Sequence, residues 1–412
     1  MLNGFPAPYP DEWWYSVLCR YFVRAGYQSH AAVSAELYGK ERVVHGSLLP
    51  GRSCYLITSR LPQGSLDLED VLMNHTLMPY YLRFYPAEKK QNVLKKMLQG
   101  SSTGITSIDI HGPDGEQGLK YCPICYMEDM EKYGEPYWHR EHQIPLMQLC
   151  PAHRAPLVKY PIQYTKLSDV YIPLASIACE KATARDIRPW EFQLTDVLMD
   201  FLTFPYGYSP EPGVNALETA LHKMGLEEDR FQKNVSLSIE KIYNAISAYY
   251  GEEISRRYFS KLSHATIHKL CNWTVTSPER YALLSVLVGL SASELFTVRE
   301  EYEDPALACL KKYQASGVLY RKSELADLIG ISPARLNSLA RKYGIAPFWK
   351  QCKTTGARRT HCVRIMLSPE EKDLLYRAVK ASGNGQTAVF ARTVVLDKAV
   401  EIIKKNKKNE PY

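Results

Sequence analysis

Two short cysteine-containing hooks in the sequence could together bind one metal ion. The first is Cys122-Pro-Ile-Cys125 and the second is Cys150-Pro-Ala-His153, so the full pattern is C-x2-C-x24-C-x2-H. Zn²⁺ prefers four nitrogen or sulfur ligands in a tetrahedron, and each hook can direct two such ligands at one ion. A proline follows the first cysteine of each hook and fixes φ there, which reduces the entropy lost on binding. We therefore predict a structural Zn²⁺ held by Cys122, Cys125, Cys150 and His153.

The alternatives for these residues are two unrelated pairs of buried cysteines or a catalytic zinc. Unrelated pairs would not be expected to repeat the same Cys-Pro-x-ligand pattern. A catalytic zinc keeps one position open for water, whereas three cysteines and one histidine close the coordination sphere. His139-x-Glu141 follows the first hook, which is the wrong order for a zinc deaminase, and the zincin pattern H-E-x-x-H is absent. We expect His139 and His142 to be structural or contact residues, and we expect no enzymatic activity.

The basic C-terminal quarter is the second region whose residue types indicate a function. Residues 311–412 contain 21 basic and 8 acidic side chains, whereas residues 1–310 contain 30 basic and 36 acidic ones, giving the net charge of +7. A basic end on an acidic body is expected for a protein that contacts nucleic acid. A solvated basic face would have the same composition, so the charge alone leaves both interpretations open.

Residues 322–341 have the pattern of a helix-turn-helix. Gly330 lies at the turn, and the small Ala326 allows two helices to cross. Ser323 is expected to cap the first helix, while Ser332 caps the second and Pro333 begins it. The second helix would cover residues 333–343 and expose Arg335, Asn337, Ser338, Arg341 and Lys342. Arginine suits guanine, asparagine suits adenine, and lysine and serine suit phosphate, so we favour DNA binding over an ordinary helical hairpin.

The last unit, residues 360–404, is expected to form a strand followed by two helices. Val363, Ile365 and Leu367 alternate with other residues as in a strand, and Ser368-Pro-Glu-Glu371 is a capping box that opens a helix. Gly383-Asn-Gly385 would separate this helix from a second one that begins near Thr387. This order resembles a ribbon-helix-helix module, in which Arg364 would enter the major groove. A small α/β extension is the alternative.

Four basic residues lie between these two units or at their border. They are Lys350, Lys353, Arg358 and Arg359, spaced with glycine and threonine. Such a segment could run as an extended arm along phosphates or in a minor groove. A plain charged linker is equally consistent with the spacing.

The elements that position these residues should be mainly α-helical and divided among several domains, since 412 residues exceed one small core. A helix is expected to begin near Asp11 and to end at Gly26, and residues 44–56 are expected to be a loop. We predict five parts: an N-terminal helical domain over 1–120, a zinc-binding unit over 121–160, a helical middle domain over 161–310, the helix-turn-helix over 311–350, and the strand-helix-helix unit over 351–412.

The N-terminus has neither the basic nor the apolar region of a signal peptide, and the longest apolar stretch, around residues 282–292, is too short to cross a bilayer. We therefore expect a cytosolic protein without a membrane partner. Its ten cysteines should remain reduced rather than form a disulfide framework.

Taken together, several motifs in residues 5–160 resemble the TnsD/TniQ family. These motifs are Phe5-Pro6-x-Pro8-Tyr9-Pro10-Asp11-Glu12, Tyr15-Ser16, Arg20-Tyr21, Val43–Leu49 with Pro50-Gly51, Tyr121-Cys122-Pro123-x-Cys125, Tyr133-Gly134-Glu135-x-Tyr137-Trp138-His139-Arg140-x-His142-Gln143-x-Pro145 and Cys150-Pro151-x-His153. The resemblance implies target selection for a TnsC-dependent transposon. TnsD-like members bind an attachment site sequence-specifically, TniQ-like members sit on an RNA-guided complex, and both recruit the AAA+ ATPase TnsC, which passes the signal to the transposase. The resemblance also implies that the two hooks supply the zinc ligands.

The resemblance and the basic C-terminal quarter together predict a TnsD-like selector. It would bind double-stranded DNA at an attachment site and recruit a TnsC-like ATPase and, through it, the transposase components. A TniQ-like adaptor on an RNA-guided (CRISPR) complex is the first alternative. It is disfavoured because no second four-cysteine ribbon follows His153 and because pairing to a guide would make protein readout of DNA unnecessary. A stand-alone zinc-containing transcription regulator is the second alternative.

Overall fold

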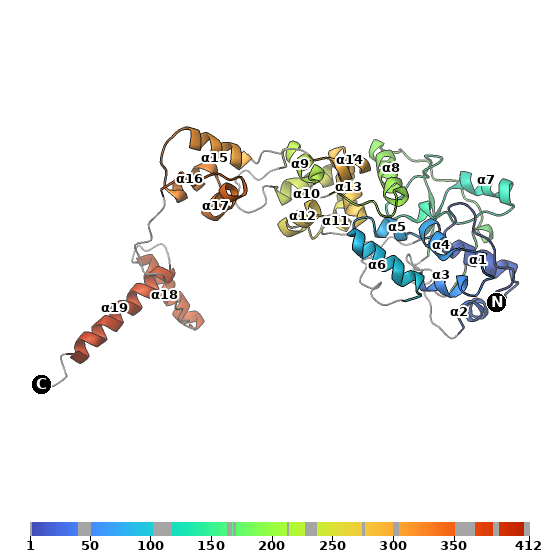
Figure 1. Ribbon diagram of the computed structural model, residues 1–412, viewed down its shortest axis with the longest axis horizontal. Coiled ribbons are helices and arrows are strands. Elements are labelled where there is room, and N and C mark those ends of the chain that lie inside the picture. Colours follow the sequence, from blue (N-terminus) through green and yellow to red (C-terminus); the bar gives the residue numbers. More distant parts are fainter. Residues whose placement is uncertain are drawn as a thin grey trace. The chain divides into compact units, whose positions relative to one another are not determined.

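The computed structural model describes residues 2–39, 51–101, 118–162, 167, 170–211, 214–226, 237–273, 277–299, 305–350, 367–381 and 387–407. The chain divides into two compact units, Met1–Lys350 and Gln351–Tyr412, here called unit 1 and unit 2. The described residues are mainly helical, as predicted (Figure 1). None of their helices combines the length and the apolar character needed to cross a bilayer.

The described part of unit 1 begins with six helices. They are α1 (Trp14–Arg24), α2 (His30–Tyr38), α3 (Gly51–Thr58), α4 (Leu68–Asn74), α5 (Met78–Tyr81) and α6 (Ala87–Leu98). The next part contains the short strands β1 (Leu119–Tyr121) and β2 (Val158–Tyr160), which pair antiparallel, and between them α7 (Pro123–Tyr133) and the 3-10 helix η1 (Glu141–Gln143). A further 3-10 helix, η3, covers Leu174–Ser176.

The remainder of unit 1 is helical. Its elements are α8 (Pro189–Thr203), α9 (Ala216–Lys223), α10 (Ile239–Tyr250), α11 (Glu252–Phe259), α12 (His264–Cys271), α13 (Pro278–Val288), α14 (Ala292–Thr297), α15 (Pro305–Ala315), α16 (Lys322–Ile329) and α17 (Pro333–Lys342). Unit 2 contains α18 (Pro369–Ala381) and α19 (Thr387–Lys407). The strand predicted around Val363 and Ile365, and the break predicted at Gly383–Gly385, lie outside the described residues.

Two of the sequence predictions about the N-terminal helices are wrong. The first helix begins at Trp14 rather than near Asp11, because Asp11 has φ 51° in the left-handed region, where a right-handed helix cannot start. Residues 51–56, predicted as loop, belong to α3, which buries Cys54 and Ile57. Gly51 suits the start of that helix, because a Cβ there would lie 2.9 Å from Met97 Cγ. The other residues of the predicted loop, 44–50, lie outside the described part.

One hydrophobic cluster of the described residues extends from Leu2 to Phe296. Phe84, which follows α5, links its early and late helices. Its ring stacks on Tyr281 of α13 at 4.0 Å between centroids and meets Phe201 of α8 edge-on at 4.9 Å. Aromatic pairs in these geometries contribute beyond the area they bury. The helices on both sides of the two cysteine hooks therefore share one core, and the domain boundaries predicted at 120, 160 and 310 remain predictions.

A second hydrophobic cluster of unit 1 extends from Ala306 to Trp349 and holds α15, α16 and α17. The turn between α16 and α17 is set by Gly330, whose φ of 81° is left-handed and easily adopted by glycine. Ser332 Oγ accepts a hydrogen bond from the backbone N–H of Arg335 at 3.2 Å, so Ser332 caps α17 as predicted. The predicted cap of α16 was wrong: Arg321 is the N-cap residue, its N–H donates to Glu324 Oε2 at 3.2 Å, and Ser323 lies inside the helix.

Unit 2 confirms the capping box predicted at the start of α18. The Ser368 N–H donates to Glu371 Oε2 at 2.8 Å, and the Glu371 N–H donates to Ser368 Oγ at 3.3 Å. These two bonds satisfy backbone donors that have no partner within the helix. The helix therefore begins where the sequence pattern placed it.

Candidate metal centre

Local backbone structure brings the two hooks together. Cys122 is the N-cap residue of α7 and Cys125 lies in its first turn, with Pro123 at the first helical position. The second hook is a tight turn, in which the Cys150 N–H donates to Ala155 O and the Arg154 N–H donates to Cys150 O, both at 2.8 Å. Pairing of β1 with β2 fixes both hooks to neighbouring strands and so places their ligands opposite one another.

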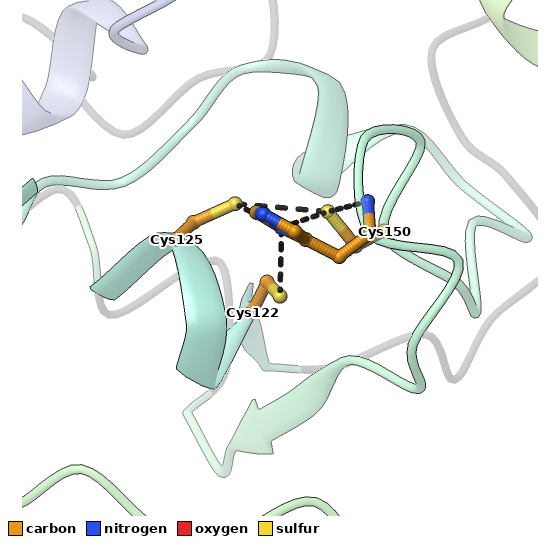
Figure 2. A group of neighbouring side chains, drawn as sticks. Cys122, Cys125 and Cys150 are labelled. Carbon is orange, nitrogen blue, oxygen red and sulfur yellow. Dashed lines mark hydrogen bonds between the residues drawn. The ribbon is translucent and has the colours of Figure 1, made fainter. Parts of the chain in front are cut away.

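The four predicted ligands converge, as Figure 2 shows for the three cysteines. His153 Nδ1 lies 3.7 Å from Cys122 Sγ, 3.3 Å from Cys125 Sγ and 3.5 Å from Cys150 Sγ. The Cys125 and Cys150 sulfurs are 3.6 Å apart. Bond lengths of about 2.3 Å to sulfur and about 2.0 Å to nitrogen in a tetrahedron give edges of about 3.8 Å and about 3.5 Å. The spacing of the donor atoms therefore fits one zinc ion with a closed coordination sphere.

Burial and crowding of the thiols also favour a cation at their centre. Hydrogen bonds from Cys125 and Cys150 lower the pKa of Cys122. The hydrogen bond to Cys122 raises the pKa of Cys125 and raises that of Cys150 to about 12, because a further thiolate would lie against the first. Without a cation, mutual repulsion limits the three cysteines to one thiolate. A bound Zn²⁺ would favour the loss of the protons from the other two thiols.

Glu128 of α7 orients the histidine of this cluster, and the sequence analysis did not find it. His153 Nε2 lies 3.1 Å from Glu128 Oε1, which leaves Nδ1 facing the sulfurs. A carboxylate that holds the distal nitrogen of a metal-binding histidine fixes its tautomer and its ring orientation. The signal was present in the spacing, since residues three apart share a helix face and Glu128 follows Cys125 by three.

Replacing Glu128 by alanine should weaken zinc binding by about tenfold, the lower end of the usual effect of such carboxylates, because the Glu128 side chain is 62% exposed. Competition with a chromophoric zinc chelator measures the change. The matched control is Glu131→Ala, which removes an exposed carboxylate from the same helix. An affinity for zinc equal to that of the unaltered protein would show that Glu128 does not orient His153.

A neighbouring group of acidic and histidine side chains consists of Asp11, His139 and Glu141. The side chains of Asp11 and His139 are engaged within the protein. Asp11 accepts hydrogen bonds from Arg140 Nε at 2.8 Å and from the Glu141 N–H at 3.0 Å, and His139 Nε2 lies 3.0 Å from Asp129 Oδ2. These contacts hold the segment before α1 against η1. They also account for the left-handed backbone at Asp11, whose carboxylate is directed at η1.

His142 lies beside this group and is completely buried. Its ring is 4.9 Å from that of His139, and within the described residues neither ring nitrogen has a hydrogen-bond partner. Burial holds its pKa well below the ordinary value for histidine, so the ring is neutral. His142 therefore fills space in the interior as an uncharged side chain.

A buried ion-pair network joins α1 to the end of α7. Arg20 donates to Glu12 Oε2 at 2.7 Å and to Glu135 Oε1 at 2.9 Å, and Arg24 donates to the same Glu135 oxygen at 2.6 Å. Burial raises the pKa of Glu12 to about 7, although Arg20 opposes this shift. The network fixes the first helix to the element that carries Cys125, and it consists of residues from motifs that are far apart in the sequence.

The residues predicted to bind DNA are only partly described. Asn337, Ser338 and Arg341 are exposed on α17, as predicted. Arg335 is only 7% exposed, so the prediction that it lies on the exposed face was wrong. Residue 335 is four positions before the buried Leu339 and therefore shares its helix face.

The other predicted DNA contacts come from the end of unit 1 and from the chain that follows it. Lys350 is exposed, and its N–H donates to Tyr320 O at 2.8 Å. The side chain of Lys342 lies outside the described part, as do Lys353, Arg358, Arg359 and Arg364.

Known proteins are similar to this chain in the region that contains the two hooks. The TniQ family model matches residues 4–157, a range that contains both hooks and the Glu12–Arg20–Glu135 network. Residues 4–157, the part that resembles this family, are therefore called the TniQ domain. The chain is also similar to the Transposon Tn7 transposition protein TnsD of Escherichia coli, with 27% identity over 157 residues. That alignment spans 37% of this chain and 31% of the relative, so the likeness covers about a third of either protein.

Proposed function

We propose that this protein selects target sites for a TnsC-dependent DNA transposon by binding double-stranded DNA sequence-specifically and recruiting the AAA+ ATPase TnsC. The observation that carries the proposal is the TniQ domain at residues 4–157, supported by its similarity to a transposition protein. The chain would act by binding alone, without covalent chemistry. The TniQ domain would serve as the platform for TnsC, and the C-terminal part would read the target.

The proposed DNA reader is a helix-turn-helix formed by α16 and α17. Its support is the capped turn at Gly330, the separate hydrophobic cluster around it, and the polar face of α17. Asn337 and Arg341 are four residues apart and so project from the same side of the helix. Asparagine can pair with adenine and arginine with guanine in the major groove. With Arg335 buried, these two side chains are the proposed base contacts on α17, and Ser338 is a proposed phosphate contact.

The basic side chains beyond α17 would add affinity rather than sequence choice. Lys342, Lys350, Lys353, Arg358, Arg359 and Arg364 are proposed to lie near DNA, mostly along phosphates, with Arg364 in the groove. Contacts to phosphate release counterions, so binding through them falls steeply with salt. The proposed zinc ion has a structural role, since Cys122, Cys125, Cys150 and His153 would fill its coordination sphere.

Replacing Asn337 by alanine should weaken binding to the selected target by roughly 1–3 kcal/mol and should leave binding to unrelated duplex nearly unchanged. Arg341→Ala should behave alike if Arg341 contacts a base. Fluorescence anisotropy with target and scrambled duplexes measures both affinities. Gln314→Ala on α15 is the matched control, because it also removes an exposed uncharged amide. Equal losses on both duplexes would assign the altered residue to phosphate contact and remove it from base reading.

A further inference from the structure

The helices α11 and α12 in the middle of unit 1 follow each other in the order of a helix-turn-helix and are unusually basic. Each has eight residues, and residues 260–263 join them. Ser263 caps α12, since its Oγ accepts a hydrogen bond from the Thr266 N–H at 3.2 Å. Residues 254–273 contain no acidic side chain and four basic ones, namely Arg256, Arg257, Lys261 and Lys269. Because residues 1–310 contain 30 basic and 36 acidic side chains, this stretch is a concentration of positive charge in an acidic body.

The charges along these two helices are ordered toward the segment that joins them. Glu252 and Glu253 lie in the first turn of α11, whereas Arg256 and Arg257 lie in its last turn. Lys261 is exposed in the joining segment. α12 has no acidic residue in its first turn, so the positive partial charge at its amino end is not offset. The positive potential is therefore strongest at the turn and along α12.

One side of α12 is buried and the opposite side is exposed. The buried side contains Ile267, Leu270 and Cys271. Ala265, His268 and Lys269 are exposed and lie within about 100° of one another around the helix, on the side away from the buried residues. The small Ala265 lies between the other two, so no bulky side chain blocks the middle of this face. A polynucleotide could therefore approach the α12 backbone closely.

The neighbouring helix α13 holds both helices in place. Arg280 Nε donates a hydrogen bond to Tyr258 O of α11 at 2.9 Å, and the Tyr281 hydroxyl donates to Leu270 O of α12 at 3.1 Å. A binding surface on helices that are fixed in this way loses little entropy when a ligand binds. The basic surface of α11 and α12 is therefore supported by the core of unit 1.

We propose that α11 and α12 form a second contact with duplex DNA, in which α12 lies in a major groove and Arg256, Lys261 and Lys269 contact phosphates. This inference rests on the function proposed above, and it adds a separate site to the one proposed at α17. In a DNA-bound helix-turn-helix the first helix crosses the sugar-phosphate backbone and the second enters the groove. A positive surface that continues from α11 through the turn to α12 matches the row of phosphates that borders such a groove.

The second contact would supply affinity and orientation rather than sequence choice. Contacts to phosphate fix the position of a protein on the duplex but carry no direct sequence information. α17 therefore remains the proposed reader of the target. A protein in which Asn337 and Arg341 are both replaced by alanine should still bind duplex through α11 and α12, without preferring any sequence.

The salt dependence of duplex binding by the full-length protein tests this second contact. The logarithm of the binding constant falls with the logarithm of the salt concentration, with a slope of about −0.9 for each phosphate contact. Replacing Lys261 and Lys269 together by alanine should make the slope shallower by about two and weaken binding to any duplex at least about tenfold at about 0.1 M salt. Replacing both by arginine should restore the slope and the affinity, because arginine also contacts phosphate.

The matched control replaces Lys132 and Lys181 together by alanine. Both lysines are exposed, and each follows a glutamate in the sequence, Glu131 and Glu180. This control removes the same net charge and should leave the slope nearly unchanged. Circular dichroism should show equal helical content in all variants, since the altered side chains are exposed.

An unchanged slope after Lys261 and Lys269 are replaced would overturn the second contact. An equal change in the control would also overturn it, because net charge alone would then explain the effect. Binding that prefers no sequence but loses about two from its slope would retain the second contact and overturn sequence reading by α17. A protein that binds no duplex at all would overturn both proposals.

Discussion

Replacing Cys125 by serine should release the bound zinc and lower the free energy of unfolding by about 4 kcal/mol or more. The Cys125 sulfur is 3.3 Å from His153 Nδ1 and 3.6 Å from Cys150 Sγ, so it forms one corner of the proposed tetrahedron. A hydroxyl is a poor zinc ligand, and the remaining three donors would be left in a site shaped for four. Loss of a structural metal is among the few changes that reach this magnitude. Metal content by mass spectrometry and urea unfolding measure the two effects.

The control for this variant is Cys179→Ser, since Cys179 is exposed and outside the four-residue cluster. It should retain one equivalent of zinc and unfold at the same urea concentration as the unaltered protein. A Cys125→Ser protein with full metal content would show that the ion, if present, is held elsewhere. A metal-free protein of undiminished stability would show that zinc has no structural role.

Replacing Arg83 by methionine should lower the free energy of unfolding by about 3–5 kcal/mol. The Arg83 side chain is completely buried and donates to four backbone carbonyls in the last turn of α8 and in the loop that follows it. These acceptors are Phe201 O at 2.8 Å, Phe204 O at 2.6 Å, Pro205 O at 2.9 Å and Tyr208 O at 3.1 Å. Burial lowers the pKa of Arg83 to about 10, so the guanidinium still carries its charge at neutral pH. Methionine fills a similar volume but leaves the carbonyls without this donor.

Urea unfolding followed by tryptophan fluorescence measures the loss for Arg83→Met. Arg256→Met on the exposed side of α11 is the matched control and should change stability by less than about 0.5 kcal/mol. Equal stability of the two variants would contradict the view that Arg83 fastens the TniQ domain to the helices that follow it. A loss confined to Arg83→Met would support one cooperative core from Leu2 to Phe296.

Patterns that depend on local spacing were predicted well from the sequence. The two hooks needed only their own residue types and intervals, and the structure brings all four side chains within bonding distance of one ion. The caps at Ser332 and Ser368 were also found, because a cap is defined by a hydrogen bond to a residue three positions away. The mainly helical fold class followed from apolar periodicity in the same way.

Features that depend on distant residues could not be predicted from the sequence. Asp11 resembles a helix cap in the sequence. In the structure its carboxylate instead accepts hydrogen bonds from Arg140 and from the Glu141 N–H, about 130 residues away. Arg335 resembles a DNA contact by type, but its helix face is the one that α17 buries. No local signal marks Arg83 as a cation held by carbonyls, because its acceptors are backbone atoms of another helix and loop. Each of these outcomes is decided by tertiary packing rather than by residue type.

The central claim, direct reading of a DNA target by this chain, is tested most directly by selecting tight-binding sites from a random duplex library with the purified full-length protein at about physiological salt. We predict one strongly enriched sequence, and we predict that the enrichment is lost when Asn337 and Arg341 are both replaced by alanine. Binding that is sensitive to salt but enriches no sequence would contradict the claim. The chain would then obtain its target from another molecule, as an adaptor on a guide complex does.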